Sequence, residues 1–135
     1  MIQITIPGEP VAKARPRLSN GHTYTPAKTK HYEALIKKCW QDQSNEHLTG
    51  PLSLHLTAYF GIPKSKPRAE RKKMAVGEKR PTKRPDLDNI IKTIDALNGL
   101  AFDDDSQIVA VVAEKYYSQE PRVLADRKSG SAGMP

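Results

Sequence analysis

Aspartates are concentrated in one short segment of this chain, next to its most basic stretch. Six of the eight aspartates lie between Asp86 and Asp105, in the segment RPDLDNIIKTIDALNGLAFDDDSQIV. The preceding residues, Lys64–Arg84, hold ten of the 22 lysines and arginines and are called the basic stretch below. Carboxylates bind hard cations such as Mg²⁺, whereas lysines and arginines bind phosphates. The combination is typical of a metal-dependent enzyme that acts on a polyanion.

Local geometry brings several of these side chains together. Asp86 and Asp88 are two residues apart, so in an extended segment they point to the same side. A helix that begins near Asp88 places this carboxylate at the positive end of the helix dipole, with Lys92 one turn further on the same face. The helix is followed by a turn, and Asp103–Asp105 lie where the next strand begins. A helix–turn–strand unit folds back on itself, which could bring the start of this strand near the start of the helix. We expect one of the three aspartates to complete a metal site.

This arrangement suits Mg²⁺, with Mn²⁺ as the alternative, because both cations prefer oxygen ligands and retain water molecules for chemistry. The cation would polarise a phosphoryl oxygen and lower the pKa of a bound water, which becomes the nucleophile. Lys92 would neutralise charge in the transition state or give a proton to the leaving oxygen. The structural alternative is that DLD caps a helix and DDD is a solvated turn. Asp95 shares the face of Asp88, but we expect it to be an exposed bystander.

The composition indicates an acidic partner. The 135-residue chain has a formal net charge of +7, which favours nucleic acid first and an anionic membrane surface second. No apolar run approaches the roughly 20 residues that span a bilayer, and MIQITIPGEP lacks the pattern of a signal peptide. A single cysteine, Cys39, fits a reducing compartment and lies on an apolar helical stripe, where we expect core packing. We therefore expect a cytoplasmic, nucleoid-associated protein that binds DNA and not membranes.

Other catalytic arrangements are not indicated by the sequence. Its four histidines are scattered without the spacing of metal ligands, and it has no Gly-rich phosphate loop, CxxC pair or serine elbow. The basic residues are instead expected to contact phosphates, which makes DNA binding steeply dependent on salt. The proposed DNA-binding residues are Lys13, Arg15, Arg17, Lys72, Lys73, Arg80, Lys83 and Arg84.

The elements that must position these residues follow from apolar periodicity. Residues 2–6 and 52–60 alternate between apolar and polar side chains, as half-buried strands do. Thr25 followed by Pro26 is typical of a helix N-cap with proline at the first helical position, and an apolar stripe continues to about residue 43. Residues 21–25 suit a short hairpin or an extended edge.

The second half of the chain predicts two more helices and two strands. The basic stretch contains a short helix at Arg68–Ala75 that ends by Gly77, and a second helix runs from Asp88 to a stop signal at Asn98 and Gly99. Residues 108–117 predict a strand that is mostly buried on both faces, and residues 122–125 predict a strand that pairs with it. Residues 128–135 are small and polar, and we expect a disordered tail.

The segment RPDLDNIIKTIDALNGLAFDDDSQIV resembles the signature of the RusA family of Holliday junction resolvases. The order of features matches. A basic segment precedes DLDN, a lysine follows one helical turn later, the helix continues through the residues DAL, and a DD-x-Q turn leads into a strand. GEPVAKARPR and YTPAKTKHYE resemble prophage-type members, and EKYYSQEPRV resembles the last hairpin of the family. The resemblance covers most of residues 1–125.

The resemblance implies a role for individual residues. The metal-binding aspartates of the family fall on Asp86, Asp88 and Asp105, and its catalytic lysine falls on Lys92. Asp104 matches the first aspartate of the DD pair and is expected to be an auxiliary metal ligand. The remaining aspartate of the run, at position 103, need not be acidic in the family and is expected to be a bystander.

The resemblance also implies a fold and an activity. The expected fold is α+β, a small mixed sheet with two main helices packed on it, in one domain at residues 1–127 followed by the tail at 128–135. The expected activity is that of a homodimer that binds four-way or otherwise branched DNA and makes paired, symmetric nicks with Mg²⁺ in DNA recombination and repair. Two alternatives remain open: a less selective flap or fork nuclease, and a non-catalytic DNA-binding module.

Overall fold

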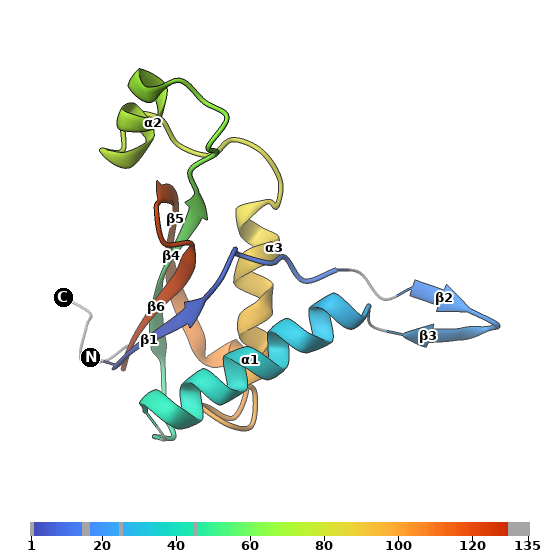
Figure 1. The fold of residues 1–135 in the computed structure, drawn as a ribbon. Coiled ribbons are helices and arrows are strands. Elements are labelled where there is room, and N and C mark those ends of the chain that lie inside the picture. Colours follow the sequence, from blue (N-terminus) through green and yellow to red (C-terminus); the bar gives the residue numbers. More distant parts are fainter. Residues whose placement is uncertain (1, 15–16, 25, 45, 130–135) are drawn as a thin grey trace.

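The computed structural model describes residues 2–14, 17–24, 26–44 and 46–129, which form a mixed four-stranded sheet with helices beside it (Figure 1). The strands are β1 (Ile2–Pro7), β4 (Leu52–Gly61), β5 (Ile108–Ser118) and β6 (Arg122–Ser129), in the spatial order β1-β6-β4-β5. β4 runs parallel to β5 and antiparallel to β6, which in turn runs antiparallel to β1. The predicted α+β class with a mixed sheet is confirmed.

The last strand lies elsewhere than predicted. β6 pairs with β1 and β4, not with β5, because residues 119–121 cross the end of β4. Gly61 at this end lies close to Glu9: its N–H donates to Oε1 of Glu9 at 2.9 Å, and a Cβ there would lie 2.4 Å from the same oxygen. β6 also continues to Ser129, so the expectation of a short final strand is wrong, and residues 128 and 129 belong to the strand.

The β5 strand is not buried on both faces. It lies at the edge of the sheet, and Val109 and Val112 are 60% and 57% exposed. Its continuous apolar run resembles that of a central strand, which explains the wrong prediction. The helices cover only one face of the sheet, so side chains on the other face of β5 stay in contact with solvent (Figure 1).

Three α-helices and two 3-10 segments complete the described part of the main domain. They are α1 (Ala27–Gln43), α2 (Arg68–Ala75), α3 (Leu87–Ile91), η1 (Lys92–Leu97), which continues α3, and η2 (Asp105–Gln107). A hairpin of β2 (Arg17–Ser19) and β3 (His22–Tyr24) projects from the body (Figure 1). Pro26 occupies the cap position of α1 and Ala27 begins the helix, one residue later than predicted. Thr25 lies outside the described residues.

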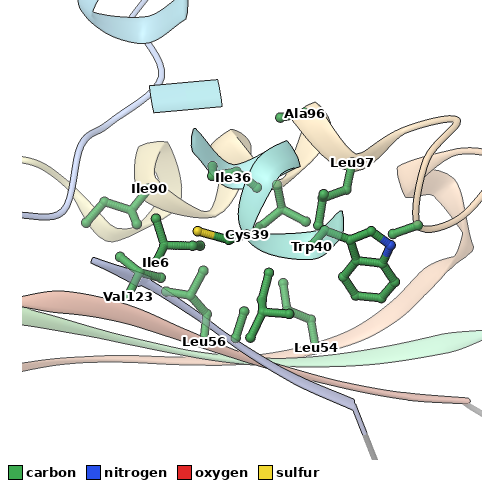
Figure 2. Close-up of a cluster of buried hydrophobic side chains, with 14 of the residues drawn as sticks. Ile6, Ile36, Cys39, Trp40, Leu54, Leu56, Ile90, Ala96, Leu97 and Val123 are labelled. Atoms are coloured by element: carbon green, nitrogen blue, oxygen red, sulfur yellow. The ribbon is translucent and has the colours of Figure 1, made fainter. Parts of the chain in front are cut away.

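The core lies between the sheet and the helices α1 and α3–η1 (Figure 2). In β4 the alternating residues Leu52, Leu54 and Leu56 point to the helices and are at most 2% exposed, as their period predicts. Figure 2 shows side chains of α1, among them Ile36 and Cys39, lying between the sheet and the helix α3–η1, which includes Leu97. Within the described residues no helix is long and apolar enough to cross a membrane.

Cys39 lies in this core, as predicted, and should react slowly with thiol reagents. It is 6% exposed, and burial, followed by the nearby Asp42 carboxylate, raises the pKa of its thiol. Because the thiolate is the reactive form, we expect alkylation by iodoacetamide to be at least tenfold slower in the native protein than in denaturant, which mass spectrometry would measure. Equal rates in the two conditions would contradict this placement.

Candidate active site

Asp86 stands at the start of α3 without capping it through its side chain. Its carbonyl oxygen accepts hydrogen bonds from the N–H groups of Asn89 and Ile90, both at 3.1 Å, whereas its carboxylate makes no capping bond. The exposed side chain lines a pocket of about 700 Å³ together with Lys28 and Asn89. The capping interpretation of the DLD motif therefore does not account for Asp86, whose carboxylate is accessible to a ligand.

Lys115 of β5 fixes the backbone that leads into Asp86. Its ammonium group donates hydrogen bonds to the carbonyl oxygens of Lys83 at 2.8 Å and Pro85 at 2.9 Å. The same group lies 5.2 Å from the centre of the Phe60 ring. The end of the basic stretch is thereby attached to the sheet, and this attachment sets the position of Asp86.

Asp95 and Asp105 are a pair of neighbouring carboxyl groups in the candidate site. They lie near enough to share a hydrogen bond, and with Lys92 they line a pocket of about 420 Å³. Partial burial, and then Asp105, raise the pKa of Asp95 to about 6, while Lys13 opposes the shift. The expectation of a fully exposed Asp95 is therefore wrong, because the side chain is only about one-third exposed and pairs with charged neighbours. Its spacing of one turn from Lys92 and two turns from Asp88 was the signal that could have identified it.

Lys13 forms an ion pair with Asp95. Its ammonium nitrogen lies 3.5 Å from Oδ2 of Asp95 and 3.6 Å from Oε2 of Glu33, a residue of α1 that sequence reasoning did not single out. The Lys13 N–H also donates to the carbonyl oxygen of Asn89 at 2.9 Å. Lys13 therefore serves to connect the N-terminal loop, α1 and α3–η1 around the candidate site. In this position it is less accessible to a phosphate than we predicted.

The three consecutive aspartates before β5 have different partners. Asp103 accepts a hydrogen bond from His47 at 2.9 Å, and this bond, followed by one to the Leu100 carbonyl oxygen, raises the pKa of His47. Asp104 accepts from the N–H of Ser106 at 3.3 Å in a capping box that begins η2, so the pKa of its carboxyl is lowered. Only Asp105 lies against Asp95, which singles it out among the three.

The expected convergence of Asp86, Asp88 and Asp105 is not present in this arrangement. The described residues contain no group of three or more His, Cys, Asp or Glu side chains placed to hold a metal ion. The physical reason is the length of the helix: Asp88 and Asp95 are seven residues apart, or roughly 10 Å along the axis. Asp105 lies near the second half of α3–η1, by Asp95, and Asp86 lines a different pocket at the beginning.

The remaining predicted DNA-binding residues lie at several places. Lys72 and Lys73 are exposed on α2, and Lys83 and Arg84 are exposed just before α3. Arg80 lies 4.0 Å from the centre of the Tyr116 ring and 3.4 Å from the carboxylate of Glu114, so part of its donor capacity is used within the protein. Arg15 and the side chain of Arg17 are outside the described residues.

Comparison with known proteins identifies the family. The model of the endodeoxyribonuclease RusA family matches residues 7–125, nearly the whole chain. The chain is also 43% identical over 132 residues to a Bacillus subtilis (strain 168) protein named "Uncharacterized protein YqaN", covering 90% of this chain and 92% of that relative. The matched region contains the six aspartates between Asp86 and Asp105, Lys92 and the whole basic stretch. This chain belongs to the RusA family of endodeoxyribonucleases.

Proposed function

We propose that this chain is a Mg²⁺-dependent endonuclease that resolves four-way DNA junctions, with Mn²⁺ as the alternative cation. The observation that supports it best is the contact between Asp95 and Asp105 beside Lys92, in a chain of a nuclease family. Two carboxylates in contact repel each other unless a proton or a cation lies between them. Their oxygen atoms are the donors that a hard divalent cation prefers, so the residues present fit such a cation.

Asp95 and Asp105, which are in contact, are proposed to hold the cation in this arrangement. Asp86 and Asp88, the other metal ligands that the resemblance implies, lie at the start of α3, and we propose that they join the site when the cation and the DNA bind. Asp104 remains a weaker, auxiliary candidate because its carboxylate is used in the η2 cap. A divalent cation held there would polarise the scissile phosphate and lower the pKa of a bound water.

Lys92 is the proposed cationic assistant in the reaction. It lines the same pocket as Asp95 and Asp105 and is exposed. Its ammonium group would stabilise negative charge on the phosphate oxygens as the phosphorus–oxygen bond breaks, or give a proton to the leaving oxygen. Lys13 orients Asp95 through their ion pair and keeps a positive charge beside its carboxylate.

A homodimer explains how paired nicks arise. One chain supplies one set of carboxylates, whereas resolution of a junction requires two symmetry-related cuts. A two-fold dimer would present two such sites with the symmetry of the junction. Because lysines and arginines on phosphates carry little sequence information, junction selectivity would come from the placement of the phosphates. The proposed role is in DNA recombination and repair.

The activity is tested with a panel of substrates that share one sequence. We expect the purified protein with Mg²⁺ to cut a four-way junction symmetrically, at least tenfold faster than a fork, a flap or linear duplex, and EDTA to stop cleavage. Denaturing gel electrophoresis of end-labelled strands would reveal both nicks. Equal cutting of linear duplex would exclude a resolvase in favour of a less selective nuclease, and the absence of cleavage on every substrate would exclude the nuclease proposal.

A further inference from the structure

A basic crevice lies beside α2, apart from the carboxylates of the candidate active site. Its volume is about 830 Å³, and it lies between α2, the end of β4 and the turn that joins β5 to β6. It shares no lining residue with the pockets that contain Asp86 or the pair Asp95 and Asp105. Figure 1 shows α2 beyond the end of the sheet, next to this turn.

Four cations line this crevice without a partner of opposite charge. Arg68, Arg71 and Lys72 project from one face of α2 because their spacing follows the helical period, and Lys64 joins them from the preceding loop. Within the described residues, no carboxylate lines the crevice and none of the four cations forms an ion pair. The crevice therefore concentrates about four positive charges in one concave surface.

The walls of the crevice are held by contacts outside it. Glu70, the carboxylate within α2, is paired with Lys79 and does not line the crevice. The segment that follows α2 is attached to β5, since Arg80 contacts Glu114 and the Tyr116 ring. The cations of the crevice are thus left for a ligand while neighbouring charges secure the helix.

We propose that this crevice binds the phosphodiester backbone of a DNA arm of the substrate, as a second contact besides the candidate active site. Part of the lining is apolar and is formed by Ile62, Ala75 and Pro121, which can contact the sugars, while the cations contact the phosphates. No aromatic side chain lines the crevice among the described residues, so bases would not stack there and the proposed contact is with the backbone. The proposal rests on the proposed function, because it assigns part of the same DNA substrate to this surface.

The test compares two variants that lose the same charge. Lys64→Gln with Lys72→Gln neutralises the crevice, and Lys37→Gln with Lys38→Gln neutralises two exposed lysines of α1 that line no described pocket. Binding of a four-way junction is measured in EDTA at several salt concentrations, with circular dichroism as the check on folding. We expect the slope of log K against log salt to decrease in magnitude by about 1.8 in the crevice variant and by less than 0.5 in the control.

Different failures are distinguishable because binding and cleavage are measured separately. Equal slopes for the two variants would overturn the crevice proposal while leaving the nuclease activity of the wild-type protein intact. Absence of cleavage by the wild-type protein would exclude the proposed function, yet the binding comparison in EDTA would still stand. If polyglutamate bound to the wild-type protein and not to the crevice variant, while both bound DNA equally, the crevice would be a site for acidic peptides and our proposal would be wrong.

Discussion

Replacement of Asp105 by Asn is expected to reduce Mg²⁺-dependent cleavage of a four-way junction by about 10³-fold, or about 4 kcal/mol in activation free energy. The reason is that Asp105 lies beside Asp95 and Lys92, and a neutral amide binds a hard cation far more weakly than a carboxylate. Single-turnover cleavage rates measure the effect. The matched control is Asp103→Asn, two residues earlier, whose carboxylate contacts His47 and should retain activity within about threefold.

Asp105→Asn should also change stability in the direction opposite to activity. In EDTA at pH 7, removal of the charge beside Asp95 relieves repulsion, so we expect a melting temperature higher than that of the wild type. Asp88→Asn should reduce cleavage similarly without this stabilisation. A purely structural role for Asp105 predicts the reverse, namely a lower melting temperature and unchanged cleavage, and that result would contradict the assignment.

The pH dependence of the metal-free protein gives a further test of this pair. The pKa of Asp95 is raised to about 6 in the folded state, against about 3.9 in an unfolded chain, so the folded state binds the extra proton between these values. The stability contributed by the protonated carboxyl is complete below about pH 4 and is lost as the pH rises through 6. Thermal melts in EDTA should show this loss in the wild type and a smaller loss in Asp105→Asn.

Much of the scaffold was predictable because it depends on local periodicity. The alternation of Leu52, Leu54 and Leu56 fixes a strand with one buried face, and Gly77 and Gly99, both with positive φ, follow helices where the sequence predicts their ends. The family signature was also recognisable from the spacing of DLDN, Lys92 and DD-x-Q, and the family match confirms it. These features can be read from short, continuous segments of the sequence.

The features that the sequence did not predict depend on long-range placement. The position of β6 between β1 and β4 requires residues 119–121 to cross the end of β4, and a short connection between two strands favours a hairpin instead. Likewise, the partner of Asp105 depends on how far the loop after η1 folds back along the helix. The spacing of Asp88 and Asp95 predicts the helix face on which both lie. It does not predict whether Asp105 contacts Asp88 or Asp95.

Phe102 anchors the loop that follows η1 and leads to Asp105. Of the substitutions that we propose, Phe102→Ala should have the largest effect on stability. Phe102 is fully buried, its carbonyl oxygen accepts from the Gly99 N–H at 2.7 Å, and it forms β-bridges with Leu48 and Asn98. Loss of a buried phenylalanine ring costs about 3–5 kcal/mol through lost contacts and the cavity left behind. Urea denaturation followed by circular dichroism would measure the change.

The same substitution should affect cleavage, because Phe102 directly precedes the aspartates at 103–105. With the ring removed, the segment that positions Asp105 against Asp95 loses its anchor in the core, so we expect the cleavage rate of the folded fraction to fall at least tenfold. Phe102→Leu is the control: it retains most of the buried apolar volume, should cost less than half as much stability, and should keep cleavage within about threefold. If Phe102→Ala lost the expected stability but cleaved at the wild-type rate while folded, the position of Asp105 would not depend on this anchor.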